Sequence, residues 1–336
     1  MNIYITLDYE LFLGERTGTP ENCLIRPMDE LCKVADEHHF KFIIFVDATY
    51  LLRMHQLKGL FKEVDRHYDL VSNHVKLLAE QGHDVELHFH PQWLYSDWDE
   101  ATQQWIMDRY HYKLSDMPLV DAKKYLKEAK NLLDSIVGYK TIAYRAGGFC
   151  LDEFKEFKEV FSDLNIKYDS SVARGIHISS SIHNFDYRRI PSNQIYRFDN
   201  SITTESKGGA FTELSISSFS CSPLEFIQKI RPLKNKYSPK MVYQDGIAIN
   251  DGISLFKHRL KKLLTKNTFL ASIDGPSSNL LNLYYEKAKA NRQSDLVLIG
   301  HPKNASDVSL SNLKYFIEGL KGKAVFKTLS DINIES

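Results

Sequence analysis

The sequence has no net charge, few cysteines and no long apolar segment, and each lack excludes a class of protein. The 43 Lys and Arg residues equal the 43 Asp and Glu residues, so the chain as a whole offers no field to attract nucleic acid or an anionic membrane. Its longest purely apolar run, residues 42–46, is too short for a membrane-spanning helix. The first residues form no secretory leader, and the four cysteines form no C-x-x-C pair. We therefore expect a globular, cytoplasmic protein with reduced thiols.

Three common enzyme motifs are also missing. Neither G-x-G-x-x-G nor G-x-x-x-x-G-K-[ST] occurs, which argues against a nucleotide-binding open sheet. The G-x-S-x-G elbow does not occur either, which disfavours a hydrolase of the Ser-His-Asp type. A catalytic centre in this chain therefore has to be sought among its carboxylates, histidines and arginines.

Strand-like and helix-like segments alternate along most of the chain. β-Branched and aromatic residues favour strands at residues 2–8, 41–46, 83–90, 141–144, 166–168, 211–217, 269–273, 296–299 and 324–329. Apolar residues at helical spacing favour helices at residues 27–35, 121–137, 152–164, 255–264, 280–290 and 310–320, and in a long segment ending near residue 82. Strands separated by helices imply parallel pairing with the helices outside.

This pattern predicts an α/β fold, a distorted (β/α) barrel with seven or eight units, in which residues 1–336 form a single domain. An open doubly wound sheet is the alternative. The alternation lapses in the serine- and arginine-rich residues 173–207. We expect an insertion or long loops there, lying near the functional site.

Ionisable side chains end five of the predicted strands. In a parallel α/β protein the carboxyl ends of the strands meet at one edge and form the active site. The side chains at these ends are Asp8 and Glu10, His88 and His90, Arg145, Asp169, and His301. We therefore predict that these seven residues carry the chemistry.

The His88-x-His90 sequence is typical of a metal site. Residues two apart on a strand point to the same face, so both imidazoles can bind one ion. Two histidines and one carboxylate with an open position are the ligands of a catalytic zinc site. Asp8 and Glu10 also share a face, and either can supply the carboxylate while the other acts as general base. Glu86 is a third candidate, or a residue that orients an imidazole; two packed imidazoles without a metal are the alternative.

The three remaining strand-end residues each have a structural and a functional interpretation. Arg145 either forms a salt bridge at the strand end or pairs with the base carboxylate and holds the pKa of that carboxylate down. Asp169 either caps the following turn or hydrogen-bonds the acid–base residues. His301 is either a packed histidine or a general acid, because a pKa near ~6.5 suits the donation of a proton to a leaving amine.

Five short motifs in this order resemble those of the polysaccharide deacetylase family, the metal-dependent carbohydrate esterases with NodB homology. They are Thr6-Leu7-Asp8-Tyr9-Glu10, His88-Phe89-His90-Pro91, Arg145-Ala146-Gly147-Gly148-Phe149, Asp169-Ser170-Ser171 and the apolar strand that ends in His301. Two features differ from the family pattern. Tyr9 separates two carboxylates that are adjacent in the family, and the histidines are two apart instead of four.

The resemblance implies a distorted (β/α) barrel and a metal-dependent hydrolase. Its expected reaction removes an N-acetyl group from a sugar or glycan precursor, for instance in cell-surface polysaccharide synthesis. In this assignment Asp8, His88 and His90 bind one divalent ion, and Zn²⁺ is the ion expected. The expected partner is the N-acetylated sugar, with no nucleic acid and no membrane span, and no pattern indicates an oligomeric state.

The same resemblance implies roles for the other strand-end residues. Glu10 takes a proton from the attacking water, Arg145 orients the carboxylates, Asp169 supports the acid–base residues, and His301 protonates the leaving amine. Two other functions stay open from the residues alone. A glycosidase on a similar barrel would use Asp8 and Glu10, or Glu86, as its two carboxylates. A relative with altered motifs would bind carbohydrate without turning it over.

Overall fold

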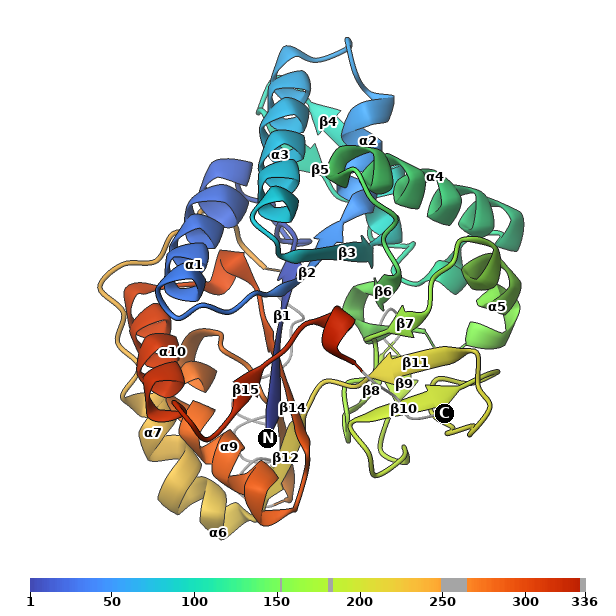
Figure 1. Ribbon diagram of the computed structural model, residues 1–336. Coiled ribbons are helices and arrows are strands. Elements are labelled where there is room, and N and C mark those ends of the chain that lie inside the picture. The colour runs from blue at the N-terminus through green and yellow to red at the C-terminus, as the bar shows by residue number, and fades with distance from the viewer. Residues whose placement is uncertain (152, 181–183, 249–264, 333–336) are drawn as a thin grey trace.

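The computed structural model describes residues 1–151, 153–180, 184–248 and 265–332 (Figure 1). One large sheet runs through these residues, in the order β10-β11-β7-β6-β3-β2-β1-β14, and β15 also pairs with β1. All of its pairs are parallel except β10 with β11. Its strands are β1 (Asn2–Tyr9), β2 (Ile43–Asp47), β3 (Asp84–Phe89), β6 (Ala143–Ala146), β7 (Tyr168–Asp169), β10 (Ile195–Phe198), β11 (Phe211–Leu214), β14 (Asp295–Gly300) and β15 (Val325–Phe326).

One backbone and one side-chain hydrogen bond link β14, at one end of this sheet, to the chain beyond β11, near the other end. The chain that continues from β11 donates the Ser217 backbone N–H to the Val297 carbonyl of β14 at 3.0 Å. The Val297 N–H in turn donates to the Ser217 hydroxyl at 3.0 Å. These two bonds nearly close the sheet into a ring, which confirms the predicted α/β fold with a distorted (β/α) barrel.

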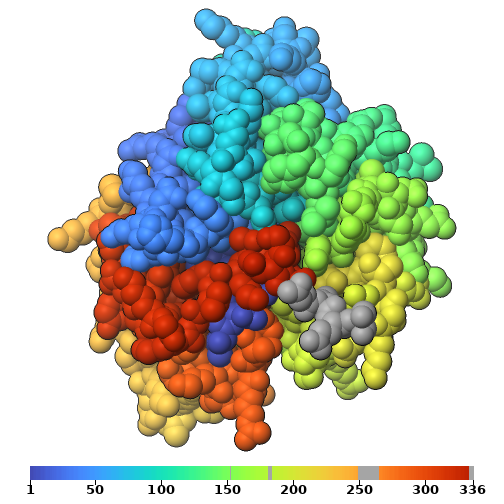
Figure 2. Space-filling model, in the orientation of Figure 1, coloured from blue at the N-terminus to red at the C-terminus, as the bar shows by residue number. Residues whose placement is uncertain are grey.

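The helices lie outside the barrel strands (Figure 1). They are α1 (Arg26–Glu37), α2 (Ala48–Gln56), α3 (Lys62–Glu80), α4 (Leu119–Val137), α5 (Phe154–Asp163), α6 (Pro223–Glu225), α7 (Arg231–Asn235), α9 (Leu281–Ala290) and α10 (Asp307–Gly319). Helix α10 packs against α1 at the surface, where Figure 2 shows red beside blue. The helix predicted at residues 255–264 lies outside the described residues. Among the described helices, none combines the length and the apolar character that a membrane crossing requires.

The central strand β1 carries polar side chains into the buried interior of the barrel. All seven residues from Ile3 to Tyr9 are buried, because β2 and β14 flank the strand and helices cover it. A parallel strand covered in this way is apolar over most of its length. Thr6 and Asp8 therefore need partners inside the protein.

Residues 173–207 contain more regular structure than the expected loops. The short strands β8 (His177–Ser179) and β9 (Asn184–Asp186) pair with each other, and β10 joins the main sheet beside β11. Along β10, Tyr196 and Phe198 are buried while Ile195 and Arg197 are less covered. This alternation is a strand signal that the surrounding serines and arginines obscured. Two further antiparallel pairs lie outside the sheet, β4 (Asp97–Asp99) with β5 (Gln104–Ile106) and β12 (Ser218–Cys221) with β13 (Asn267–Leu270).

Candidate metal centre

Parallel pairing places the predicted site residues at one end of the barrel. Asp8 lies in β1 and His88 in β3, and β2 lies between these two strands. Asp8 pairs with Phe45 of β2, and Phe45 pairs with Glu86 of β3, two residues before His88. Arg145 pairs with His88 in the next strand, β6. Since these strands run in the same direction, their carboxyl ends present their side chains to a common space.

Glu10, His88 and His90 form a compact, buried cluster. Glu10 Oε2 lies 2.6 Å from His90 Nε2 and 3.2 Å from His88 Nε2, and the two Nε2 atoms are 3.0 Å apart. Within the part of the chain that the structure describes, these residues are the group whose ligand atoms all lie within 4.8 Å of one another. One carboxylate and two imidazoles are a donor set that suits zinc.

The protonation of His88 shows that this cluster fits a cation. His88 Nδ1 donates to the Arg145 carbonyl at 2.8 Å, and a carbonyl can only accept, so Nδ1 carries the proton of the neutral ring. The lone pair of Nε2 then faces Glu10 Oε2, which is also an acceptor. Two buried acceptors in contact repel each other unless a proton or a metal ion lies between them.

The charge around His88 agrees with this interpretation. Burial alone would lower the pKa of His88, but the carboxylates of Asp8 and Glu10 raise it to about 9. Burial likewise opposes ionisation of Glu10, but Lys303 and His90 hold its pKa well below the usual range. The carboxylates of Asp8 and Glu10 therefore stabilise positive charge beside His88, whether a proton or a divalent ion supplies it.

The second histidine is held by its backbone and by close packing. The His90 N–H donates to the Thr49 hydroxyl at 2.9 Å. Its ring packs on Gly147, where a Cβ atom would come within 2.5 Å of Nδ1. That Nδ1 is buried, and the described residues offer it no hydrogen-bond partner. The close approach of the ring therefore requires glycine at position 147.

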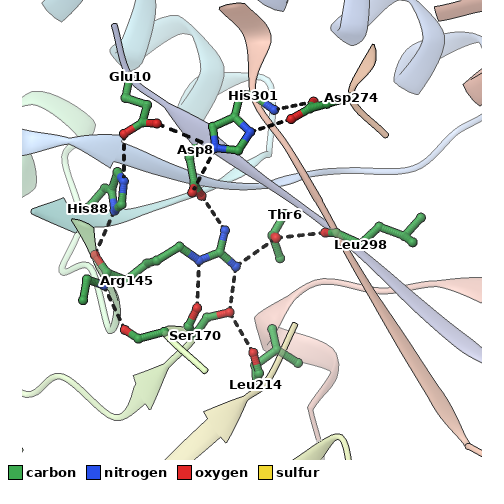
Figure 3. A network of polar contacts seen from close by, with 12 residues as sticks. Thr6, Asp8, Glu10, His88, Arg145, Ser170, Leu214, Asp274, Leu298 and His301 are labelled. Carbon is green, nitrogen blue, oxygen red and sulfur yellow. Dashed lines mark hydrogen bonds and ion pairs between the residues drawn. The ribbon is translucent and has the colours of Figure 1, made fainter. Parts of the chain in front are cut away.

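Asp8 is bound by a fully buried arginine rather than by the histidines. One terminal nitrogen of Arg145 donates to Asp8 Oδ1, and the other donates to Thr6 Oγ1 at 2.9 Å and Ser170 Oγ at 2.7 Å (Figure 3). Arg145 Nε donates to the Ser170 carbonyl at 2.8 Å, and the guanidinium stacks 4.1 Å above the centre of the Phe45 ring. This packing fixes the orientation of Asp8.

His301 faces both carboxylates from the opposite side of the site. Its Nε2 lies 3.6 Å from Asp8 Oδ2 and 3.6 Å from Glu10 Oε1 (Figure 3). Its Nδ1 donates to Asp274 Oδ2 at 2.6 Å, and its backbone N–H donates to the other oxygen of Asp274 at 2.9 Å. Burial would lower the pKa of His301, but Asp274, Asp8 and Glu10 raise it overall.

Two of the predicted carboxylates lie away from the histidine cluster. Glu86 accepts hydrogen bonds from the backbone N–H groups of Ile142 and Ala143, both at 2.7 Å, so it caps the start of β6 and does not orient an imidazole. Asp169 accepts hydrogen bonds from the Ser171 hydroxyl at 2.8 Å and the Ser171 N–H at 3.0 Å. It supports the loop behind Arg145.

Two residues of the site were not predicted from the sequence. Asp274 follows the predicted strand at residues 269–273, so an acidic residue directly after a strand was the signal that could have indicated it. Lys303 donates to Glu10 Oε1 and to the Leu11 carbonyl, both at 2.8 Å. It lies two residues after His301, and no spacing rule marks a lysine there.

The fold of this chain resembles those of solved structures. No protein-family model and no curated protein matches the chain. A protein named as a polysaccharide deacetylase from Mycobacterium smegmatis aligns with a TM-score of 0.51 at 14% identity, over 98% of this chain and 87% of that one. A GH57 branching enzyme from Thermococcus kodakaraensis aligns with a TM-score of 0.50 at 10% identity, over 99% and 72%. These likenesses show that the chain has the polysaccharide-deacetylase fold that the five motifs predict.

Proposed function

We propose that this protein is a metal-dependent hydrolase that removes an N-acetyl group from a sugar or glycan precursor. The observation that carries the proposal is the buried cluster of Glu10, His88 and His90, in which acceptors converge on a space that a cation would stabilise. The ordered pairs Asp8–Arg145 and His301–Asp274 flank this cluster. The fold shared with a protein named as a polysaccharide deacetylase supports the choice of substrate. The cytoplasmic location stays a prediction.

In the proposed site, Glu10, His88 and His90 hold the divalent ion, with Zn²⁺ expected. Glu10 replaces Asp8, the ligand expected from the sequence, because its carboxylate contacts both imidazoles whereas that of Asp8 is held by Arg145. When bound, the ion would supply Lewis-acid chemistry, lowering the pKa of water and polarising the acetyl carbonyl.

The flanking pairs supply the proton transfers in this proposal. Burial opposes ionisation of Asp8, but Arg145 and the neighbouring histidines lower its pKa, so it is ionised at neutral pH and accepts the proton of the attacking water. His301 has a raised pKa and is held by Asp274 with Nε2 towards the site. It donates its Nε2 proton to the nitrogen as the C–N bond breaks, which gives acetate and the free amine.

Asp169 has a positioning role in this proposal. Ser171, which donates its hydroxyl to Asp169, accepts a hydrogen bond from the Ala146 N–H at 2.9 Å. Asp169 therefore fixes the backbone directly after Arg145. It does not need to contact the substrate.

Metal analysis combined with an activity assay tests the proposal. Protein purified without chelator should hold about one divalent ion per chain. It should release acetate from N-acetylglucosamine or its oligomers. The pair His88→Ala and His90→Ala should lose both the ion and the activity. His67→Ala is a matched control, because His67 is a buried imidazole outside the cluster. Full activity with unchanged metal content in the His88 and His90 variants would refute the assignment.

A glycosidase is the second candidate, because a GH57 branching enzyme has the same fold. Such an enzyme needs one carboxylic acid that stays protonated until it reaches the leaving group. Asp8 and Glu10 both have lowered pKa values, since Arg145 and Lys303 outweigh the effect of burial. Glu86 has a pKa raised to about 8, but its carboxylate bonds the backbone at the start of β6 and not this site. This arrangement favours the deacetylase over the glycosidase. Cleavage of a glycosidic bond that resists chelators would select the glycosidase, and sugar binding without turnover would select a non-catalytic relative.

A further inference from the structure

A buried lysine contacts the carboxylate of the proposed metal ligand. Lys303 lies in the 3₁₀ helix η7 (Pro302–Asn304), which directly follows His301. Its side chain is 9% exposed, and its Nζ donates to Glu10 Oε1 at 2.8 Å and to the Leu11 carbonyl at 2.8 Å. Burying an ammonium group is costly unless it is paired and hydrogen-bonded, so these contacts determine where the side chain lies.

The two oxygens of Glu10 face different groups. Oε2 faces the imidazoles, 2.6 Å from His90 Nε2 and 3.2 Å from His88 Nε2. Oε1 accepts from Lys303 at 2.8 Å, and His301 Nε2 lies farther from it, at 3.6 Å. A carboxylate whose second oxygen accepts from an ammonium group presents one oxygen, and a reduced negative charge, to a metal ion.

We propose that Lys303 is a positioning residue that restricts Glu10 to binding the metal through Oε2 alone. The inference rests on the proposed metal centre. A carboxylate can also bind through both oxygens and then occupies an additional coordination position. A catalytic site needs that position for water or substrate. Lys303 holds Oε1 and neutralises part of its charge, so one coordination position of the ion stays open for water or substrate. The ion also keeps more of its positive charge to polarise the carbonyl group.

A purely structural role makes the opposite prediction for metal binding. If Lys303 only anchors the loop after β1 through the Leu11 carbonyl, its loss should loosen Glu10 and weaken metal binding. If Lys303 restrains Glu10, its loss should free Oε1, remove one competing positive charge and strengthen metal binding. Activity should fall in either case, so activity alone does not separate the two roles.

The test compares metal binding by the full-length wild type with that by Lys303→Met and Lys303→Gln. Zn²⁺ affinity is measured in competition with a chromophoric chelator. Coordination is followed by the visible spectrum of the Co²⁺-loaded protein. We expect both variants to bind Zn²⁺ more tightly and to release acetate about 10- to 100-fold more slowly. The Co²⁺ absorption should weaken as the coordination number rises. Lys303→Arg, which keeps a donor and a charge, should restore the wild-type spectrum.

Lys130→Met is the matched control for removing a buried lysine. Lys130 pairs with Asp134 at 2.9 Å within α4, so its loss should leave metal affinity and the Co²⁺ spectrum unchanged. Weaker or unchanged Zn²⁺ binding in the Lys303 variants, with an unchanged Co²⁺ spectrum, would overturn the inference while the metal centre stands. Failure of the wild type to bind either ion would refute the metal centre and this inference together. The Lys303→Gln variant keeps the test valid if Lys303→Met does not fold.

Discussion

Replacing Gly147 by alanine tests the geometry of the metal centre with a single methyl group. The added Cβ would lie 2.5 Å from His90 Nδ1 and 2.8 Å from its Cγ and Cε1. An ordinary contact begins at 3.4 Å, so the ring has to move by the difference, 0.9 Å. The φ angle of Gly147 is not positive, so the effect of the substitution is steric and not a backbone strain.

The displacement should affect both metal binding and stability. His90 Nε2 lies 2.6 Å from Glu10 Oε2, and a shift of the ring moves this nitrogen out of the cluster. A misplacement of about 1 Å lowers a rate by roughly 100-fold. Disturbing a metal ligand costs about 10- to 100-fold in affinity. Overpacking in a buried region costs about 1–3 kcal/mol in the free energy of unfolding.

The assays are Zn²⁺ affinity, acetate release and denaturant unfolding of Gly147→Ala. Gly319→Ala is a suitable control, because a Cβ at the end of α10 has open space around it. That variant should keep its metal affinity and gain up to about 1 kcal/mol of stability. Wild-type metal affinity and activity in Gly147→Ala would show that His90 is not a ligand in this position, and would refute the reasoning.

Three further predictions concern buried charges near the site. Arg145→Met should destabilise the protein by about 3–5 kcal/mol in denaturant unfolding, because Asp8 is left buried without its partner; an equal loss in the Asp8→Asn, Arg145→Met double variant would argue against this cause. Burial raises the pKa of Glu86 to about 8 from 4.5, so ionisation costs stability as the pH rises through this range, and Glu86→Gln should gain stability relative to the wild type between pH 5 and pH 8. A difference in the free energy of unfolding between the two proteins that stays constant from pH 5 to pH 8 would contradict this prediction. Asp274→Asn should lower the pKa of His301, so the alkaline limb of the kcat/KM profile should shift to lower pH, whereas an unshifted limb would exclude His301 as the acid.

The location of the site followed from the sequence because it depends only on strand direction. Asp8, His88, Arg145 and His301 each lie at or just beyond the end of a parallel strand, and such ends meet at one edge of a barrel. Period-two alternation also places His88 and His90 on one face. These rules need no knowledge of rotamers or of distant partners.

Which of the two carboxylates contacts the imidazoles could not be predicted from the sequence. Asp8 and Glu10 share a face, so alternation treats them alike. The structure distinguishes them by their partners, since Arg145 reaches across from β6 to Asp8, and Lys303 orients Glu10 towards the imidazoles. Both partners are distant in the chain, and their contacts depend on side-chain rotamers that a sequence pattern does not encode.

Strand β10 and the role of Glu86 were missed for a similar reason. The alternation of Tyr196 and Phe198 extends over a strand of four residues inside a polar stretch, too short for a clear period. Glu86 lies on the same strand as His88, but its carboxylate bonds the first N–H groups of β6. A sequence pattern gives the face of a side chain but not the unpaired backbone group that it satisfies.

The position of β1 between β2 and β14 also bears on how the protein matures during synthesis. The strand that carries Asp8 leaves the ribosome before its neighbour β14, which is synthesised nearly three hundred residues later with His301 and Lys303 directly after it. Contacts between such distant segments form slowly, because the whole intervening chain has to be brought together first. In a nascent chain β1 therefore lacks this neighbour until β14 has emerged. The charged centre is completed only once β14 pairs with β1, because His301 and Lys303 directly follow that strand.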